Sequence, residues 1–244
     1  MNRLAWIAAF LFILAVPLVL VTARVAWAVN SSGMYNRGFE KYGVSLTTGI
    51  AAADLRQAGA DIRRYFNSGE EPLVLRTRVL GMEREIFNPR EVQHMHDVKR
   101  LMRGVYAVLA GSGAYLLAAV IAGFLWRRRR FVTTLAGLCL GGGGLTLGLV
   151  LGIGLMAVMG FDSLFLTFHQ LSFSNDFWLL DPRTDYLVMM FPQGFWFDVT
   201  LLVATVTGAA ALALTALSSS YLLYRRWRRQ AHSLAQCLGD LTDV

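Results

Sequence analysis

The chain has 244 residues, of which 55% are hydrophobic and only 16% charged. Soluble domains carry about 25% charged residues, so this composition excludes an ordinary soluble protein and indicates an integral membrane protein. The formal net charge of +7 alone would allow a nucleic-acid partner, but the positions of the basic residues give it another explanation.

Four stretches contain no Asp, Glu, Lys or Arg over a length that can cross a bilayer core, which takes about 20 helical residues. We expect a membrane span around each, at about residues 4–28, 104–126, 131–160 and 197–224. The first stretch also resembles a secretory signal peptide, but its length and the central Pro17 favour a retained helix.

Basic residues flank these stretches. Arg127 to Arg130 follow the second, Arg225 to Arg229 ("RRWRR") follow the fourth, and Arg3 precedes the first. By the positive-inside rule these blocks are cytoplasmic, which places both termini inside and segments 30–103 and 161–196 outside. Membrane topology thus explains the basic charge, and no nucleic-acid partner is expected.

The first outer segment has three predicted parts. Its start, "NSSGMYNRGFEKYGVSL", mixes Gly, Asn, Ser and aromatics and is expected to be irregular. Ile50 to Phe66 follow a 3.6-residue period that predicts an amphipathic surface helix. Leu73 to Leu80 are strand-like, and two or three short strands could pair there.

The fold class expected is therefore an all-α membrane protein, a single integral membrane domain over residues 1–244. It has four transmembrane helices and a small extracytoplasmic cap of helices, with room for short strands. The sequence assigns no oligomeric state.

Asn88 begins the next predicted helix. It can cap the helix, Pro89 suits the first helical position, and Glu91 can complete a capping box. No helix breaker follows before Trp126, so one helix is expected from Pro89 to Trp126. It places His94 at headgroup level on the outer face.

The third and fourth spans are separated by an aromatic segment, punctuated by Asp-Pro and Phe-Pro, that is expected to lie in the membrane interface. Trp178, Phe195 and Trp196 fit an anchoring aromatic belt. The glycine-rich third span predicts close helix packing, since no strand or lysine accompanies it as in a phosphate-binding loop.

His94, His96 and His169 are the histidines predicted outside. On a helix His94 and His96 point about 200° apart, which makes them a poor chelating pair. His94 instead shares a face with Asp97, and a carboxylate one turn away can orient an imidazole as a general base. The alternatives are a solvated polar face and, for all three histidines, a metal site, although the ligand spacing of zinc helices is absent.

His169 lies among phenylalanines in "FHQLSFSND". A histidine in an apolar belt is more often a hydrogen-bonded structural residue than a catalyst. Ser172 and Ser174 lie close by, but neither has the G-x-S-x-G elbow of a serine hydrolase.

Two segments resemble the paired signatures of the lipoprotein intramolecular transacylase (Lit) family of bacterial membrane proteins. They are "EVQHMHDVK" (Glu91 to Lys99) and "FHQLSFSNDFWLLDPRTDYLVMMFPQGFWFD" (Phe168 to Asp198). The resemblance extends to "YNRGFEKYGV" and "TTGIAAADLRQAGADIRRYFNSGE", so it covers most of the chain.

The resemblance implies an enzyme of the bacterial cell membrane that acts on the extracytoplasmic face without cofactor or metal. Its substrates would be diacylglyceryl-modified lipoproteins. One acyl chain would move from the glycerol to the α-amine of the N-terminal cysteine, leaving a lyso-form lipoprotein. The matching catalytic positions are His94 and His169, whereas His96 is extra to the motif.

On this hypothesis, His94 is the base that takes the proton of the amine, and Asp97 orients it. His169 and Asn175 donate to developing charge. Lys99 and Arg183 are weaker candidates that would meet lipid phosphate. Two other classes stay open: a non-catalytic membrane protein that cradles lipids or lipoproteins, and a metal-dependent membrane hydrolase.

Overall fold

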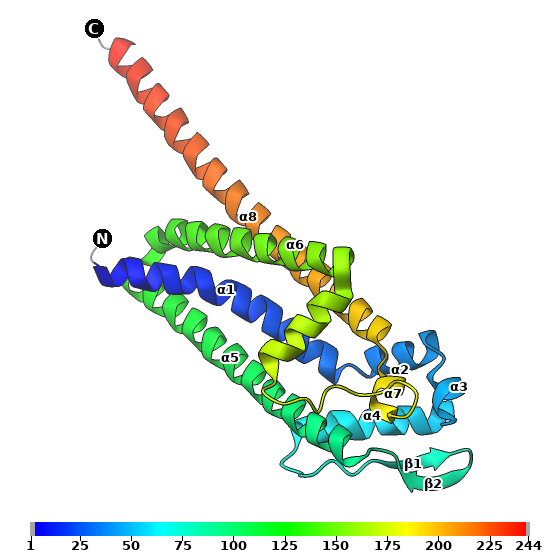
Figure 1. Ribbon diagram of the computed structural model, residues 1–244. Helices are drawn as coiled ribbons and strands as arrows, with labels where there is room; N and C mark the ends of the chain where they lie inside the picture. Colours follow the sequence, from blue (N-terminus) through cyan, green and yellow to red (C-terminus); the bar gives the residue numbers. More distant parts are fainter. Residues whose placement is uncertain (1–2, 243–244) are drawn as a thin grey trace. The chain divides into compact units, whose positions relative to one another are not determined.

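The computed structural model describes the backbone of residues 3–242 and the side chains of residues 3–231. This part of the chain is helical almost throughout, with one two-stranded hairpin (Figure 1). In chain order the elements are α1 (Arg3–Asn30), α2 (Ser32–Lys41), α3 (Val44–Thr48), α4 (Ala52–Asn67), β1 (Arg76–Val79), β2 (Met82–Glu85), α5 (Pro89–Arg127), η1 (Arg128–Arg130), α6 (Phe131–Ser172), α7 (Tyr186–Met190) and α8 (Gln193–Thr242).

Three described helical stretches are long and apolar enough to cross a membrane: Arg3–Asn30, Pro89–Ser172 and Gln193–Ala231. The middle stretch comprises α5 and α6, which the short 3₁₀ helix η1 joins. The expected helical membrane protein is confirmed at this level.

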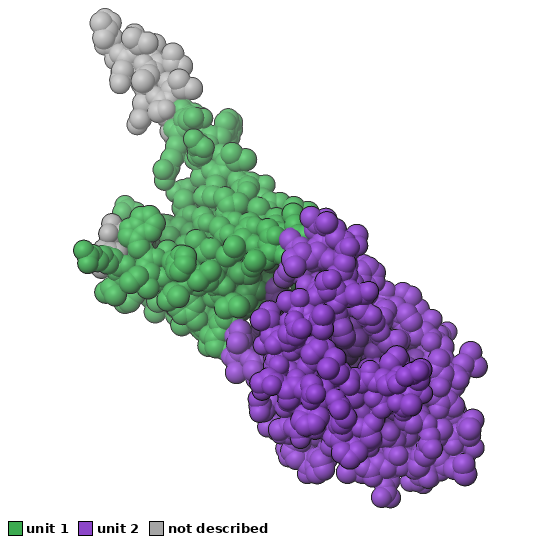
Figure 2. Space-filling model, in the orientation of Figure 1, with its two compact units in different colours: residues 1–20, 110–151, 207–244 green, residues 21–109, 152–206 purple. Residues whose placement is uncertain are grey.

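The chain divides into two compact units, which Figure 2 shows in different colours. Unit 1 contains residues 1–20, 110–151 and 207–244, and unit 2 contains residues 21–109 and 152–206. Both histidine motifs belong to unit 2.

In unit 1 the glycine-rich part of α6 packs closely against other helices. A Cβ atom built on Gly142 would lie 2.6 Å from the Cβ of Val16, and one on Gly143 would lie 2.4 Å from Oγ1 of Thr215. Only glycine permits such approaches, so the predicted packing role of this span is confirmed at these two positions.

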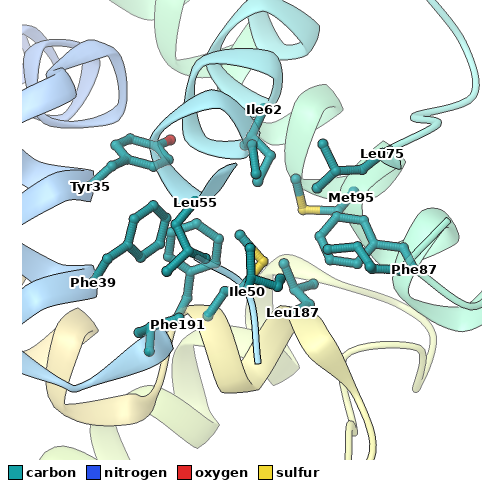
Figure 3. Close-up of a cluster of buried hydrophobic side chains, with 14 of the residues drawn as sticks. Tyr35, Phe39, Ile50, Leu55, Ile62, Leu75, Phe87, Met95, Leu187 and Phe191 are labelled. Atoms are coloured by element: carbon teal, nitrogen blue, oxygen red, sulfur yellow. The ribbon is translucent and has the colours of Figure 1, made fainter. Parts of the chain in front are cut away.

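In unit 2 a core of buried apolar side chains joins the short helices. Figure 3 shows aromatic side chains of α2 facing aliphatic side chains of α4 and the residues around α7. Leu55, Ile62 and Phe66 all point into this core from α4. The predicted amphipathic helix is therefore confirmed, and its apolar face supplies much of the hydrophobic stabilisation of the cap.

The start of this unit corrects one expectation. The stretch expected to be irregular forms two helices, α2 and α3. Although α2 is polar and short, it buries Tyr35, Gly38 and Phe39. Tertiary packing of these residues stabilises a helix that propensity alone does not predict.

The strand-like stretch forms an antiparallel hairpin in which Arg76 pairs with Glu85 and Val79 with Met82. Leu80 and Gly81 make the two-residue turn with positive φ angles of 50° and 83°, as a type I′ hairpin turn requires. Only the second half of the predicted stretch is a strand.

The predicted helix start at Asn88 is confirmed. Oδ1 of Asn88 accepts hydrogen bonds from the backbone N–H groups of Arg90 and Glu91, at 2.9 and 3.1 Å. The backbone N–H of Asn88 donates in return to Oε2 of Glu91, at 2.7 Å. This capping box fixes the first turn of α5 and, with it, the position of His94 one turn later.

The aromatic segment departs from the expected anchoring belt at Phe195. Helix α6 continues past the predicted end of the span to Ser172, with a kink at Gly160. Phe195 is buried in the core of unit 2 rather than placed in the interface, because it fills the space beside Gly38.

Candidate active site

The two histidines of the motifs lie close together. His94 stands in the second turn of α5 and His169 in the last turn of α6. Their ring centroids are 6.0 Å apart, with the planes inclined by 33°. Each residue is 8% exposed. The fold therefore brings the two predicted residues into one buried site.

Aromatic rings surround the pair. Phe173 meets the His94 ring edge-on at a centroid distance of 5.1 Å and lies 5.6 Å from the His169 ring. The centroid of the Trp178 ring is 5.1 Å from that of His169. Such a shell keeps water away and disfavours a charged imidazole.

His169 has a defined tautomer. Its Nδ1 lies 2.8 Å from the backbone oxygen of Phe165. A carbonyl oxygen only accepts hydrogen bonds, so Nδ1 carries the proton and the neutral ring keeps its lone pair on Nε2. Burial lowers the pKa of His169, and the hydrogen bond to Phe165 opposes this shift only in part.

His94 lacks such an anchor. Its Nδ1 is buried and has no hydrogen-bond partner among the described residues. Burial, followed by the neighbouring His169, lowers the pKa of His94 to about 4. His94 precedes the apolar run that starts at Gly104. Its imidazole is neutral at pH 7 and can therefore accept a proton.

Asp97 has a different partner from the one predicted. Its Oδ2 accepts a hydrogen bond from Nδ2 of Asn175 at 2.8 Å, and no hydrogen bond to His94 is present in the described structure. Asn175 also accepts a hydrogen bond from the backbone N–H of Phe177 at 3.2 Å. The expectation that Asp97 holds His94 directly is thus wrong. Asp97 fixes the loop residue Asn175 instead.

His96 stands apart from the pair. Its side chain is half-exposed, and its Nδ1 lies 3.8 Å from Oδ1 of Asp97. No group of three or more His, Cys, Asp or Glu side chains that could hold a metal ion occurs in the described part of the chain.

A cavity of about 660 Å³ adjoins the site within unit 2. One wall is the face of α5 that carries Asp97, Arg100 and Leu101, and the loop residues Phe173 and Asn175 form another. Phe173 lines this cavity and also contacts both histidine rings, so it connects the cavity wall to the histidine pair. The arrangement can hold a molecule that combines an apolar chain with a polar group.

Lys99 is inaccessible to a lipid phosphate, contrary to expectation. It is fully buried, where its Nζ donates to the backbone oxygen of Glu70 at 2.5 Å and lies 3.3 Å from Oε1 of Glu71. The ammonium also stands 3.9 Å from the centroid of the Tyr65 ring. Lys99 therefore anchors the segment after α4 to α5.

Arg183 is an exposed residue whose guanidinium pairs with Oδ2 of Asp181 at 2.7 Å. This ion pair with its own neighbour lowers the pKa of Asp181 to about 2. The structure does not bring Arg183 into contact with either histidine.

Arg90 is a positioning residue that the sequence did not reveal. Its guanidinium donates to the backbone oxygens of Asp176 and Leu179, at 2.9 and 3.4 Å. These bonds fasten the loop that carries Asn175 and Trp178. Backbone acceptors leave no pattern in a sequence, so only the position of Arg90 next to the helix cap could have pointed to it.

Comparison with known proteins gives one family. The model of the family "Lipoprotein intramolecular transacylase Lit" matches residues 10–196, a range that includes both histidines. An uncharacterized protein of Aquifex aeolicus (strain VF5) is 30% identical over 122 residues, which are 50% of this chain and 51% of that protein. The match thus spans about half the length of that relative.

Solved structures share the fold. The membrane integral lipoprotein intramolecular transacylase Lit from Bacillus cereus superposes with a TM-score of 0.76 at 16% identity, over 93% of this chain and 100% of that one. Two variants of the same protein, with a histidine replaced by arginine or by alanine, give TM-scores of 0.70 at 15% identity. They cover 93% of this chain and 95% and 96% of the variants, respectively.

Proposed function

Because the chain belongs to the family of lipoprotein intramolecular transacylases, we propose that it transfers an acyl chain within diacylglyceryl-modified bacterial lipoproteins. The chain would leave a glycerol oxygen and join the α-amine of the N-terminal cysteine. The product is an N-acylated lipoprotein whose glycerol keeps one acyl chain.

The observation that carries this proposal is the buried pair of His94 and His169, with ring centroids 6.0 Å apart. An α-amine has a pKa of about 8, and a neutral imidazole beside it can take the proton that is shed on attack. Burial keeps both rings neutral. Two neutral imidazoles at one site suit a reaction that moves a proton from one group of the substrate to another.

In the proposed reaction the amine nitrogen attacks the ester carbonyl, the new C–N bond forms, and the C–O bond to glycerol breaks. His94 accepts the proton of the amine. His169 presents the unprotonated Nε2, so in this proposal it takes the proton from His94 and then donates it to the departing glycerol oxygen. The proton that the amine loses ends on the glycerol hydroxyl, and no water is consumed.

Asn175 is the proposed donor to the tetrahedral oxyanion. Its amide nitrogen has two hydrogens, of which Asp97 accepts one, and the residue lines the adjoining cavity. Asp97 therefore acts through Asn175 by holding its amide in one orientation. A fixed donor of this kind stabilises developing charge without reorganising during the reaction.

The donor ester and the acceptor amine belong to one molecule, so positioning supplies much of the rate and no protein nucleophile is needed. The cavity beside Phe173 would hold an acyl chain in place. With four spans and both termini inside, as the arginine blocks indicate, the histidines would face the outer leaflet, where mature lipoproteins are anchored.

The test is expression in a bacterium that lacks lipoprotein N-acyltransferases, with the N-terminal peptide of a reporter lipoprotein fragmented by mass spectrometry. We expect an N-acylated fragment with the wild-type chain and with the control His96→Gln, and none with His94→Gln or His169→Gln. An unchanged diacylglyceryl peptide from well-expressed wild-type protein would support a non-catalytic lipoprotein-binding protein. A peptide that has lost an acyl chain would indicate a hydrolase.

A further inference from the structure

Unit 1 contains a cavity of about 490 Å³ between α6 and α8. Its lining combines three arginines, Arg225, Arg226 and Arg229, with Thr133 and apolar residues that include Leu140 and Leu222. The cavity shares no lining residue with the histidine site.

The positive charge of this cavity has no carboxylate partner among the residues with described side chains. No Asp or Glu of residues 3–231 lines it. None of the three arginines makes a hydrogen bond or ion pair with any residue whose side chain the structure describes. Arg228, by contrast, stands over the ring of Tyr224 at 5.9 Å and does not line the cavity. The cavity therefore concentrates positive charge from one side of α8.

Two polar atoms in the lining lack partners. Nε of Arg225 and Oγ1 of Thr133 are buried and make no hydrogen bond among the described residues. Buried donors are normally satisfied, and each unsatisfied one calls for a ligand or an ion. A guanidinium and a hydroxyl together form the donor set that suits phosphate oxygens.

The positive-inside rule explains why arginines follow the span that ends near Tyr224. The rule does not explain why these arginines line a cavity that has leucines in its lining and buried donors without partners. Arginines that only set topology can be fully solvated and need no such cavity. The leucines favour a ligand with an acyl chain next to its phosphate, and the cavity lies where an apolar run meets a basic one. Basic pockets between membrane helices bind anionic lipid headgroups in this way.

We propose that the cavity binds an anionic phospholipid. The phosphodiester lies against Arg225, Arg229 and Thr133, and the start of an acyl chain lies against Leu140 and Leu222. The site does not depend on the transacylase activity and concerns a different molecule from its substrate.

The test is native mass spectrometry of the full-length wild-type protein in detergent, with phosphatidylglycerol or phosphatidylcholine of identical chains. We expect phosphatidylglycerol to bind at least tenfold more tightly. Arg225→Gln should weaken its binding about fivefold, on the basis of the contribution of one basic residue near an anionic lipid. The control Arg228→Gln removes the same charge from the same helix and should leave binding within twofold.

Arg225→Lys is the second variant, because it keeps the topological charge while it loses the guanidinium fork. It should weaken phosphatidylglycerol binding at least twofold without altering membrane insertion. Three results would overturn the proposal: equal binding of the two lipids, equal losses in Arg225→Gln and Arg228→Gln, or complete displacement of phosphatidylglycerol by millimolar inorganic phosphate. The last result would make the cavity a site for free phosphate.

Discussion

The side-chain amide of Asn175 donates a hydrogen bond of 2.8 Å to Asp97 across 78 positions of the sequence. This bond ties the loop after α6 to the third turn of α5; His94 lies one turn earlier on α5, and His169 lies in the last turn of α6. It is therefore one of the contacts, with those of Arg90 and Phe173, that join this loop to the helix of His94.

We predict that Asp97→Leu and Asn175→Leu are not additive. Each substitution alone leaves one polar partner unsatisfied, whereas the double variant removes both. The coupling energy should be about 1.5–3 kcal/mol, the range for hydrogen bonds to charged groups. Denaturant unfolding of the purified single and double variants measures it, and additivity within about 0.5 kcal/mol would contradict the account.

A comparison of Asn175→Leu with Asp97→Asn distinguishes an oxyanion donor from a residue that only positions it. Asn175→Leu removes the proposed oxyanion donor and should lower the rate of N-acyl product formation about 100-fold or more, with little change in KM. Asp97→Asn keeps an acceptor for the amide of Asn175, so its loss should be much smaller. Equal losses in Asn175→Leu and Asp97→Asn would assign Asp97 a role of its own.

Stability should depend on pH through His94. Its pKa falls from 6.5 in the unfolded chain to about 4 in the fold, so the folded state binds fewer protons between these values. The contribution of His94 to the free energy of unfolding is therefore largest above pH 6.5. It decreases as the pH falls toward 4, by at most about 1.4 kcal/mol per pH unit. Thermal unfolding from pH 7 to 4.5 should therefore lose less stability in His94→Gln than in the wild type, and parallel curves would refute this.

Lys99 should matter for stability. Lys99→Met removes the ion pair with Glu71 and the contact with the Tyr65 ring and should destabilise the fold by about 2 kcal/mol. Arg103 lies one turn later and makes only a 3.5 Å contact with the backbone of Ser68. As the matched control, Arg103→Met should change the free energy of unfolding by no more than about 0.5 kcal/mol. Lost activity with unchanged stability in Lys99→Met would instead assign Lys99 to the chemistry.

Helix α2 offers two glycines for comparison. A Cβ on Gly38 would meet Cδ2 of Phe195 at 2.4 Å, whereas one on Gly33 would lie 3.7 Å from Oγ of Ser31. Gly38→Ala should cost about 1–3 kcal/mol through overpacking, and Phe195→Leu should restore part of this loss. Gly33→Ala should be neutral or stabilising by up to about 1 kcal/mol. Equal effects at the two positions, measured by thermal unfolding, would show that α2 does not pack on Phe195.

Local signals predicted a good part of this structure. The start of α5 followed from Asn88 and Glu91, because a capping box is formed by neighbours in sequence. The period of Ile50 to Phe66 predicted α4, and the family signatures singled out His94 and His169, whose rings the fold brings close together. These features depend on short-range geometry or on long, ordered motifs.

The predictions that were wrong concern residues whose contacts are made with distant parts of the chain. Spacing placed Asp97 one turn from His94, but the amide of Asn175, remote in sequence, takes its carboxylate. Lys99 was expected to meet lipid phosphate, but Glu70 and Glu71 supply its partners inside the fold. Helices α2 and α3 lack strong helical signals and form because they pack on the core.

The most direct test of the central claim uses purified protein and two synthetic diacylglyceryl lipopeptides, one with unlabelled and one with deuterated acyl chains, mixed in equal amounts. Intramolecular O-to-N transfer is an isomerisation, so each product should keep the mass of its substrate. Tandem mass spectrometry should find the acyl chain on the cysteine nitrogen with its original label, and no such product with His94→Gln. Crossed labels, a chain lost to water, or undiminished transfer in His94→Gln would contradict the account.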